Sequence, residues 1–387
     1  MINLIKQITL LLILSPFISF AQDYPSFGPE IDVTIQDLNF DAMEPFISPD
    51  GSHLLFNSLN DGVNTKLYYA SRMNDSTFTF IGEVNGPNQP IPPHLDAVAD
   101  LDSQGNFYWT STRDYPSDLD NLFHGSYEDG VVTEIGRVRG DFNKNTPGWL
   151  VMDHGISHNG QFLYYNNARF DDNNCQGICE TELGIAQKVN DSTFNTTPDF
   201  EYILQNIIDS SYIYYAPCIS SDDLEFYYSR YPRDTVTVNT LFEICVAVRN
   251  TDSDPFSTPA VLFSELIGDL IEAPTLTVDK QILYYHRKVP GSHKVVMRYR
   301  EASNSIAEEN LASMISIYPN PAQETLYIQS EIGLENLKVS LFNLLGEEVL
   351  VSRNQLEIKL MDLSSGTYFV RIEMDGNFIS KRVVILD

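Results

Sequence analysis

The sequence predicts an all-β protein, in which a five-bladed β-propeller at residues 22–300 is followed by a small immunoglobulin-like β-sandwich at residues 315–387. Three observations predict this class: an internal repeat of roughly 55 residues, alternating apolar and polar residues within each repeat, and a composition rich in strand and turn formers. The chain contains 21 Tyr and 22 Phe together with 21 Gly and 20 Pro, and these residue types favour strands and turns over helices.

The repeat is visible in five segments that share a short apolar run, a turn and then a strand rich in aromatic residues. The five segments are 44–58, 98–111, 153–167, 216–230 and 273–287. Their turns end at Gly51, Gly105, Gly160, Asp223 and Lys280, so the pattern recurs after 54, 55, 63 and 57 residues. A period this regular is typical of a repeat architecture.

Each repeat continues with a third strand, a second turn and a fourth strand. The third strands are expected at residues 66–70, 121–125, 183–186, 241–245 and 295–299. The second turn is nearly identical in two repeats, at 74–78 and 190–194, and fourth strands are expected at 78–84 and 131–138. Four antiparallel strands in a repeat of this length are typical of a propeller blade. An aliphatic residue of each innermost strand is expected to pack between blades, at Ile47, Leu101, Ile156, Ile219 and Leu276.

Closure of the ring is expected to depend on the N-terminal segment. The fifth repeat has only three predicted strands, because the chain turns polar at Glu301. We expect residues 30–35, which precede the first blade, to complete the last blade and so remove an open strand edge. A six-bladed ring is the alternative, but it requires a blade that the sequence pattern does not contain.

The first repeat carries a recognisable motif. Residues 44–51 read Glu-Pro-Phe-Ile-Ser-Pro-Asp-Gly, and this stretch resembles the WD40-like repeats of TolB-type propellers, whose signature is xPxISPDGxxLxF. The other four repeats are degenerate versions of the motif. The resemblance implies a propeller and no particular activity.

The first 21 residues have the features of an export signal. Lys6 supplies a positive charge, an apolar stretch follows at residues 8–20, and Ser19 and Ala21 place small residues before a cleavage site at Gln22. A membrane anchor is the alternative, but the apolar stretch is too short to span a bilayer. No other run approaches about 18 apolar residues, so we expect a soluble mature protein that reaches the periplasm by Sec export.

A polar linker at residues 301–314 precedes a strand-rich segment at 315–387. This segment resembles the C-terminal sorting domain of the type IX secretion system. The resemblance rests on residues 317–321, 339–349, 363–372 and 381–387, with motif positions Tyr318, Pro319, Asn320, Pro321, Gly346, Gly366, Tyr368 and Lys381. It implies that the outer-membrane type IX machinery reads and usually removes the domain, and that the protein is released or attached to the cell surface. A sandwich that itself binds carbohydrate is the alternative.

Charge and cysteine content narrow the range of partners. The 24 Lys and Arg against 53 Asp and Glu give a net charge of −29, which argues against nucleic acid and anionic membranes as partners. In an exported protein, Cys175 and Cys179 are placed to close a small surface loop, whereas Cys218 and Cys245 lie in apolar strand patterns typical of core residues. Their pairing stays open. No two pairs have the spacing of zinc ligands, so we expect no cofactor, and we expect a monomer.

Catalysis at the central funnel is the alternative function. The chain has no room for an α/β-hydrolase domain, and residues 155–160 lack the nucleophile elbow. His154 and His158 are separated by roughly 13 Å on a strand, too far for one zinc ion. Carboxylates near the starts of the inner strands are candidates to converge as in a glycoside hydrolase or lyase. These are Asp41, Glu44, Asp96, Asp100, Asp153 and Glu272, of which Glu44, Asp96, Asp100 and Asp153 are the catalytic candidates.

Binding of a protein or glycan partner is the preferred function. The loops between the second and third strands of each blade share the face of the funnel mouth and place arginines beside aromatic residues, a combination that recognises carboxylates, sugars or peptides. The ligand-binding candidates are Arg113, Tyr115, Arg169 and Arg230. The alternative is that these arginines tie neighbouring loops together. Asp171 and Asp172 offer oxygen ligands to calcium but lack the full calcium-loop signature.

Overall fold

The computed structural model describes residues 24–171, 177–233, 236–301, 315–330, 337–343, 347–361, 363–374 and 377–386. One compact unit contains Pro29–Arg298, and a second contains Pro25–Gly28 with Tyr299–Asp387. The predicted export signal and nearly all of the predicted linker lie outside the described residues. Within the described part of the chain, no helix has the length and apolar character needed to cross a membrane.

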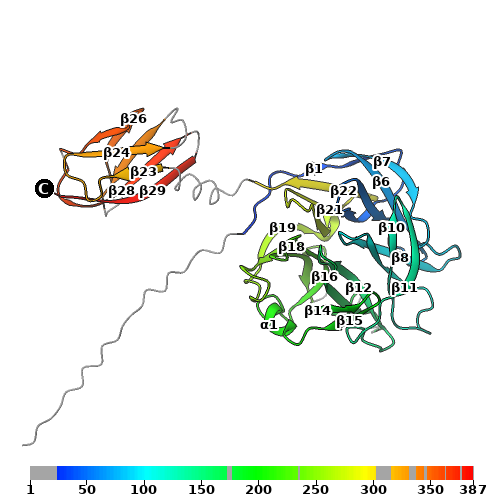
Figure 1. Cartoon of the computed structure of the whole chain (residues 1–387). Helices are drawn as coiled ribbons and strands as arrows, with labels where there is room; N and C mark the ends of the chain where they lie inside the picture. The colour runs from blue at the N-terminus through cyan, green and yellow to red at the C-terminus, as the bar shows by residue number, and fades with distance from the viewer. Residues whose placement is uncertain are drawn as a thin grey trace, which may run out of the picture. The chain divides into compact units, whose positions relative to one another are not determined.

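The first unit consists of five sheets whose strands follow one another in the chain (Figure 1). The first sheet contains β3 (Met43–Ile47), β4 (His53–Asn57), β6 (Leu67–Asn74) and β7 (Thr77–Glu83). The second contains β8 (His94–Leu101), β9 (Asn106–Ser111), β10 (Leu122–Glu128) and β11 (Val131–Arg137). The third contains β12 (Trp149–Ile156), β13 (Phe162–Arg169), β14 (Glu180–Asn190) and β15 (Thr193–Thr196). The fourth contains β16 (Tyr212–Ile219), β17 (Glu225–Pro232), β18 (Leu241–Val248) and β19 (Ala260–Leu266). The fifth contains β20 (Ile271–Leu276), β21 (Ile282–Val289) and β22 (Ser292–Tyr299).

The innermost strands of the five sheets form a closed ring. Strand β3 contacts β8, β8 contacts β12, β12 contacts β16, β16 contacts β20, and β20 contacts β3 again. Figure 1 shows the sheets arranged around a common centre. The predicted all-β propeller class is therefore confirmed.

The N-terminal segment joins the last sheet to the first. Strand β1 (Ile31–Asp32) pairs antiparallel with β22, with Ile31 opposite Met297, and so supplies the missing fourth strand. Strand β2 (Thr34–Gln36) then pairs in parallel with β7 of the first sheet. Val33, between the two strands, is buried in a cluster that contains residues of both sheets. The prediction assigned residues 30–35 to the last blade alone, and the structure divides this segment between two blades.

Aromatic pairs in the second strands explain how the blades pack. Successive side chains of a strand point to opposite faces of its sheet. Accordingly, Tyr164 packs in a cluster with Tyr214 and Phe226 of the fourth sheet, whereas Tyr165 packs in a cluster with Tyr108 of the second sheet. The Tyr164–Tyr165 pair thus contributes one side chain to each neighbouring interface, and burial of both side chains stabilises the ring of blades.

Three short elements had no counterpart in the sequence prediction. Strand β5 (Asn64–Thr65) pairs in parallel with β8. Helix α1 (Phe200–Leu204) follows β15 and buries Ile203 and Leu204 in the cluster between the third and fourth sheets. A 3-10 turn, η1 (Ile267–Asp269), precedes β20. All three occupy connections between strands.

The second unit contains two sheets of its own. One contains β23 (Ile315–Tyr318), β24 (Thr325–Ser330) and β27 (Glu357–Lys359). The other contains β25 (Lys338–Phe342), β26 (Glu348–Arg353), β28 (Gly366–Met374) and β29 (Asn377–Ile385). Residues of both sheets, among them Ile328, Val339 and Val370, share one buried cluster that runs from Ile315 to Ile385.

The cysteines differ in oxidation state. Cys218 and Cys245 are free, and Cys245 is buried, as expected of core residues. Cys179 is disulfide-bonded, and Cys175 lies outside the described residues. Burial raises the pKa of both free thiols to about 12, so they are protonated at neutral pH and poorly reactive.

Candidate functional site

A cavity of about 410 Å³ lies on the face of the propeller where the inner strands begin. We call it the loop-face cavity, because residues from the loops after β4 and β13 help to line it. All five blades contribute, and its lining residues are Glu44, Asn60, Gly62, Leu95, Ala97, Val98, Thr110, Thr112, Leu150, Met152, Asp153, Phe170, Ile178, Tyr215, Ala216, Glu272 and Ala273. The combination of apolar side chains with a few acidic ones is typical of a small-ligand site.

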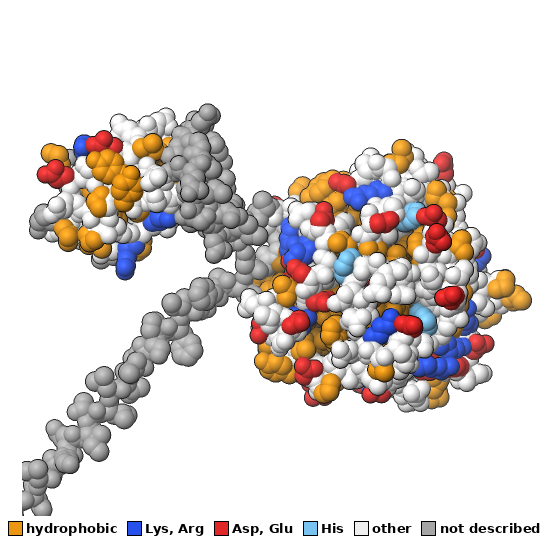
Figure 2. Space-filling model, in the orientation of Figure 1, with side chains coloured by type: hydrophobic (Ala, Val, Ile, Leu, Met, Phe, Trp, Pro, Cys, Tyr) orange, Lys and Arg blue, Asp and Glu red, His pale blue; other side chains and the backbone are white. Residues whose placement is uncertain are grey.

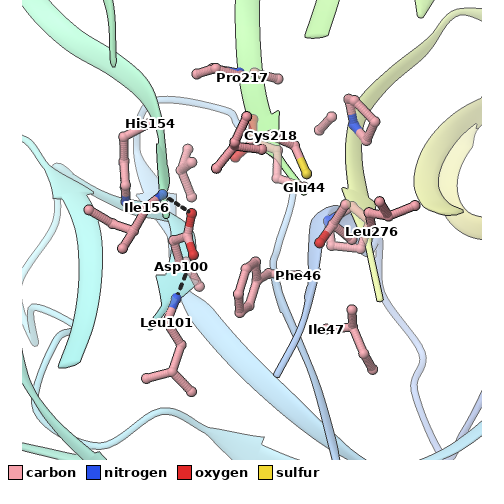
Figure 3. Close-up of a pocket in the computed structure, with 18 of the residues that line it drawn as sticks. Glu44, Phe46, Ile47, Asp100, Leu101, His154, Ile156, Pro217, Cys218 and Leu276 are labelled. Carbon is pink, nitrogen blue, oxygen red and sulfur yellow. Dashed lines mark hydrogen bonds between the residues drawn. The ribbon is translucent and has the colours of Figure 1, made fainter. Parts of the chain in front are cut away.

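A smaller cavity of about 80 Å³ lies towards the turns that end the inner strands, and we call it the turn-face cavity (Figure 3). Five residues line both cavities, one from each inner strand: Glu44, Val98, Asp153, Ala216 and Ala273. These five side chains therefore surround the central channel at the level where the two cavities meet.

Backbone bulges hold this ring of residues in place. Glu44, Val98, Ala216 and Ala273 have φ values of 50°, 56°, 49° and 56°, and the pairing of each inner strand with its neighbour shifts register at these residues. A bulge leaves a backbone N–H without its ladder partner. In each case a side chain of the preceding blade accepts that hydrogen: His286 for Glu44, Asn57 for Val98, Asp153 for Ala216 and Ser229 for Ala273. The same contacts bind successive blades together.

Three carboxylates from three different blades come together here. Glu44 Oε1 accepts a hydrogen bond from Asn60 Nδ2 at 2.7 Å, and Asp153 Oδ2 accepts one from the Ala216 N–H at 3.1 Å. Glu272 Oε1 is 2.9 Å from His286 Nε2. Since His286 Nδ1 accepts the Glu44 N–H, its Nε2 carries the hydrogen that Glu272 accepts.

The three carboxyl groups differ in pKa. Burial raises the pKa of Glu44 well above its ordinary value, and the charges of Asp153 and Glu272 raise it further. Burial likewise raises the pKa of Asp153 to about 7. Burial acts in the same direction on Glu272, but its hydrogen bonds, above all the one from His286, outweigh burial and leave the pKa of Glu272 lowered. At neutral pH the cluster therefore pairs an ionised Glu272 with groups that retain protons.

The other predicted carboxylates do not join this cluster. Asp96 is fully buried, bonds Arg113 at 3.1 Å and accepts the Gln89 N–H. Asp41 bonds Ser292 and His293. Asp100 lines only the turn-face cavity, where it accepts the N–H groups of Leu101 and Ile156, as Figure 3 shows. These three side chains link neighbouring segments of the propeller.

We expect Asp100 to make stability fall as pH rises. Burial raises the pKa of Asp100 to about 7, against about 3.9 in an unfolded chain. Between these pH values the folded state binds more protons than the unfolded state, so the free energy of unfolding falls as pH rises. Asp100→Asn should therefore gain in melting temperature relative to wild type between pH 5 and pH 8. The comparison with wild type cancels His154, whose pKa burial lowers to about 3 and which acts in the opposite direction. A difference that does not vary with pH would contradict this assignment.

The predicted ligand-binding residues are held by partners within the propeller. Arg113 lies over the Phe123 ring at 4.6 Å, and Arg230 bonds Glu243 at 2.7 Å. Arg169 pairs with Asp171 and Glu180, and the Tyr115 hydroxyl accepts the Gly148 N–H. On the face drawn in Figure 2, basic side chains lie beside acidic ones. None of the four residues lines either central cavity.

Calcium and other metals have little support among the described residues, which contain no group of three His, Cys, Asp or Glu arranged to hold a metal ion. Asp171 pairs with Arg169, and Asp172 lies outside the described residues.

Sequence reasoning missed His286, Asn60 and Tyr215. The signal for His286 was its repeat position, since it occupies the same place in its repeat as Asn57 and Ser229 do in theirs.

In the second unit, several predicted motif residues make structural contacts. The Asn320 side chain donates to the Arg382 carbonyl and accepts the Val384 N–H, each at 2.9 Å, and so ties the segment between Pro319 and Pro321 to β29. The Tyr318 ring stacks on Tyr327. The remaining positions are Tyr368, which donates to the Ser364 carbonyl, Gly366 at the start of β28 and Lys381 on β29, while Gly346 lies outside the described residues.

Residues 316–386 match the family model of the secretion system C-terminal sorting domain. This part of the chain is a sorting domain. Such a domain directs secretion through the type IX system, so the protein passes the periplasm and reaches the cell surface or the medium. The sorting domain accordingly has the type IX machinery as its partner. No curated protein matches the sequence of the chain.

Solved structures similar to the chain include a putative TolB, a family 117 glycoside hydrolase and an α-L-arabinofuranosidase. A putative TolB from Agrobacterium tumefaciens is 15% identical, with 67% of this chain and 74% of that chain covered and a TM-score of 0.38. Zg3597, a family 117 glycoside hydrolase from Zobellia galactanivorans, is 10% identical, with 72% and 90% covered and a TM-score of 0.44. The catalytic domain of a GH62 α-L-arabinofuranosidase from Coprinopsis cinerea is 12% identical, with 71% and 96% covered and a TM-score of 0.41. At these values the similarities do not indicate what this chain does.

Proposed function

We propose that the secreted propeller binds a glycan in its loop-face cavity. The observation that supports this best is the cavity itself, at about 410 Å³ and with walls from all five blades. Its volume lies within the range of roughly 300–1,000 Å³ that small-ligand sites occupy. A protein partner generally needs about 800 Å² of surface on each side, so a cavity of this volume favours the end of a glycan over a protein face.

The lining supports the same conclusion. Phe170 is 43% exposed although it lines the cavity, so its ring is available to a ligand. Asn60 and Thr112 add polar groups that hydroxyls of a sugar can meet. Apolar walls combined with a few placed polar groups give a ligand both affinity and orientation.

Phe170→Ala is expected to weaken glycan binding by at least about tenfold, as loss of an aromatic anchor commonly does. The measurement is binding of the purified full chain to a printed glycan array, followed by titration of the best-bound oligosaccharide. Tyr202→Ala is the matched control, because Tyr202 is 53% exposed on α1 and does not line the cavity. An equal loss of glycan affinity in both variants would contradict a site in this cavity, as would an affinity that Phe170→Ala leaves unchanged.

Glycoside cleavage is the second candidate, and the three carboxylates favour it. Glycosidases pair a protonated carboxyl group with an ionised one, and here Glu44 and Asp153 have raised pKa values beside an ionised Glu272. Each of the three also has a structural hydrogen bond, which supports binding over catalysis.

The two candidates differ in what Glu44→Gln does. A glycosidase would lose turnover in this variant while keeping most of its affinity, because the amide keeps the shape of the side chain but supplies no proton. For a binding module we expect no turnover of any array glycan by the wild-type chain. Release of reducing sugar that disappears in Glu44→Gln would establish the enzyme instead.

A further inference from the structure

The loop-face cavity contains an excess of hydrogen-bond acceptors over donors where the two cavities meet. Glu44, Asp153 and Glu272 supply six carboxylate oxygens there, and the described residues that line the cavity include no Lys, Arg or His. His286, which bonds Glu272, is fully buried behind the lining. The site thus concentrates three carboxyl groups, of which Glu272 is ionised, without a cation facing the cavity.

Two polar atoms at this point make no hydrogen bond of ordinary geometry. Glu44 Oε2 is buried and is one of them. The Tyr215 side chain is 6% exposed, and its hydroxyl makes no hydrogen bond of ordinary geometry although it is close enough to Glu272 to influence its pKa. Buried polar atoms without partners are costly, and they mark a place where a ligand group is expected.

The rest of the wall is apolar. Leu95, Leu150, Met152, Phe170 and Ile178 line the cavity together with the acidic residues. A ligand that fills the cavity therefore meets carbon on its sides and carboxylates at its end. The chemistry that fits both is a cationic donor carried on a hydrocarbon stem or ring.

We propose that the loop-face cavity binds a primary ammonium group, with Glu44, Asp153 and Glu272 as its acceptors and the apolar wall around the adjoining carbons. The proposal rests on the proposed function, because it requires this cavity to be the ligand site. An ammonium offers three donors and one positive charge, which matches the unpartnered Glu44 oxygen and the ionised Glu272.

Two sources carry this chemistry: an amino sugar at the end of a glycan, and the lysine side chain of a peptide. A bare metal ion fits less well, because the described residues contain no group of three metal-ligating side chains in suitable geometry. An ammonium makes single, directional hydrogen bonds and does not require the oxygens to surround it.

Proton release adds an independent signature. Burial and mutual repulsion keep protons on Glu44 and Asp153. A bound cation lowers the pKa of a neighbouring carboxyl group, so binding at pH 6–7 should release protons to the buffer. A neutral ligand of the same shape should release none.

The test is isothermal titration of the purified full chain with matched probes at pH 6.5. Glucosamine is compared with N-acetylglucosamine, and Nα-acetyl-lysine amide with its Nε-acetylated form. In whichever pair binds, we expect the amine to bind at least about tenfold more tightly than its acetylated partner. Because binding releases protons, the measured binding enthalpy of the amine should also vary with the ionisation enthalpy of the buffer. The pair that binds identifies the source.

Variants separate this inference from the proposed function. Glu44→Gln and Glu272→Gln should each weaken binding of the amine at least about tenfold. Asp100 is a buried carboxylate that lines only the turn-face cavity, so Asp100→Asn should leave the affinity for the amine unchanged. Equal affinity for amine and acetylated probes, or no binding of either amine, overturns the ammonium site. If array glycans still bind and depend on Phe170 in that case, the proposed function stands. If they do not depend on Phe170, both fail.

Discussion

Deletion of residues 315–387 is expected to leave nearly all of the protein in the periplasm, with none at the cell surface or in the medium. The reason is that residues 316–386 are the sorting domain that the type IX machinery reads. The propeller should still fold, because its described hydrophobic clusters contain residues between Ile31 and Met297, whereas the sorting domain core lies between Ile315 and Ile385. The measurement is fractionation of cells and medium followed by immunodetection of the propeller.

A matched control is Glu357→Gln, which changes an exposed side chain on β27 and leaves the domain intact. It should be exported like the wild type. If the deleted chain reaches the surface at normal levels, the sorting domain is dispensable for export. If it disappears from every fraction, a melting curve of the purified deletion variant tells degradation of an unfolded propeller from a failure of sorting.

Deletion of residues 29–36 should lower the melting temperature of the propeller by more than about 10 °C. This segment contains β1 and β2, which join the last sheet to the first, and its residues Ile31, Val33 and Ile35 pack in the shared cluster. Glu30 adds an ion pair to Arg287 at 2.8 Å. Without these contacts β22 becomes an open strand edge, and no segment pairs with both the last sheet and the first.

Point variants separate closure from general damage to the segment. Val33→Asp places an unpaired carboxylate in the buried cluster and should reproduce much of the loss. Thr34→Asp changes the neighbouring exposed residue and should shift the melting temperature by no more than a degree or two, as surface substitutions do. Equal shifts for the two variants would show that burial of this segment does not hold the ring together.

The fold was predictable because its determinants are local and repeated. Alternating side chains and aromatic pairs recur at a regular spacing, and the Tyr164–Tyr165 pair packs on both neighbouring blades. The N-terminal segment was harder. Residues 31–36 alternate like a single strand, and only the tertiary structure shows that the chain leaves β22 of the last sheet at Val33 and pairs with β7 of the first.

The candidate site was predictable only in part. Glu44 and Asp153 were among the candidates because they lie near the starts of their inner strands. In the structure each stands three residues before the aliphatic position of its strand, where both cavities meet. Asp100 stands one residue before its aliphatic position. Two residues along a strand span about 6.6 Å, so its carboxylate lies farther along the channel and reaches only the turn-face cavity.

The sequence alone determined the propeller class and the sorting domain, because both are written as motifs and spacings within short stretches of chain. Which carboxylates meet was decided by the tertiary structure, since Glu44, Asp153 and Glu272 come from three blades and only ring closure brings them together. The arginines show the same dependence. Arg113 and Arg230 lie where a ligand site was predicted, but carboxylates on other strands of the same blade hold them, and the pattern of a single loop contains no information about those partners.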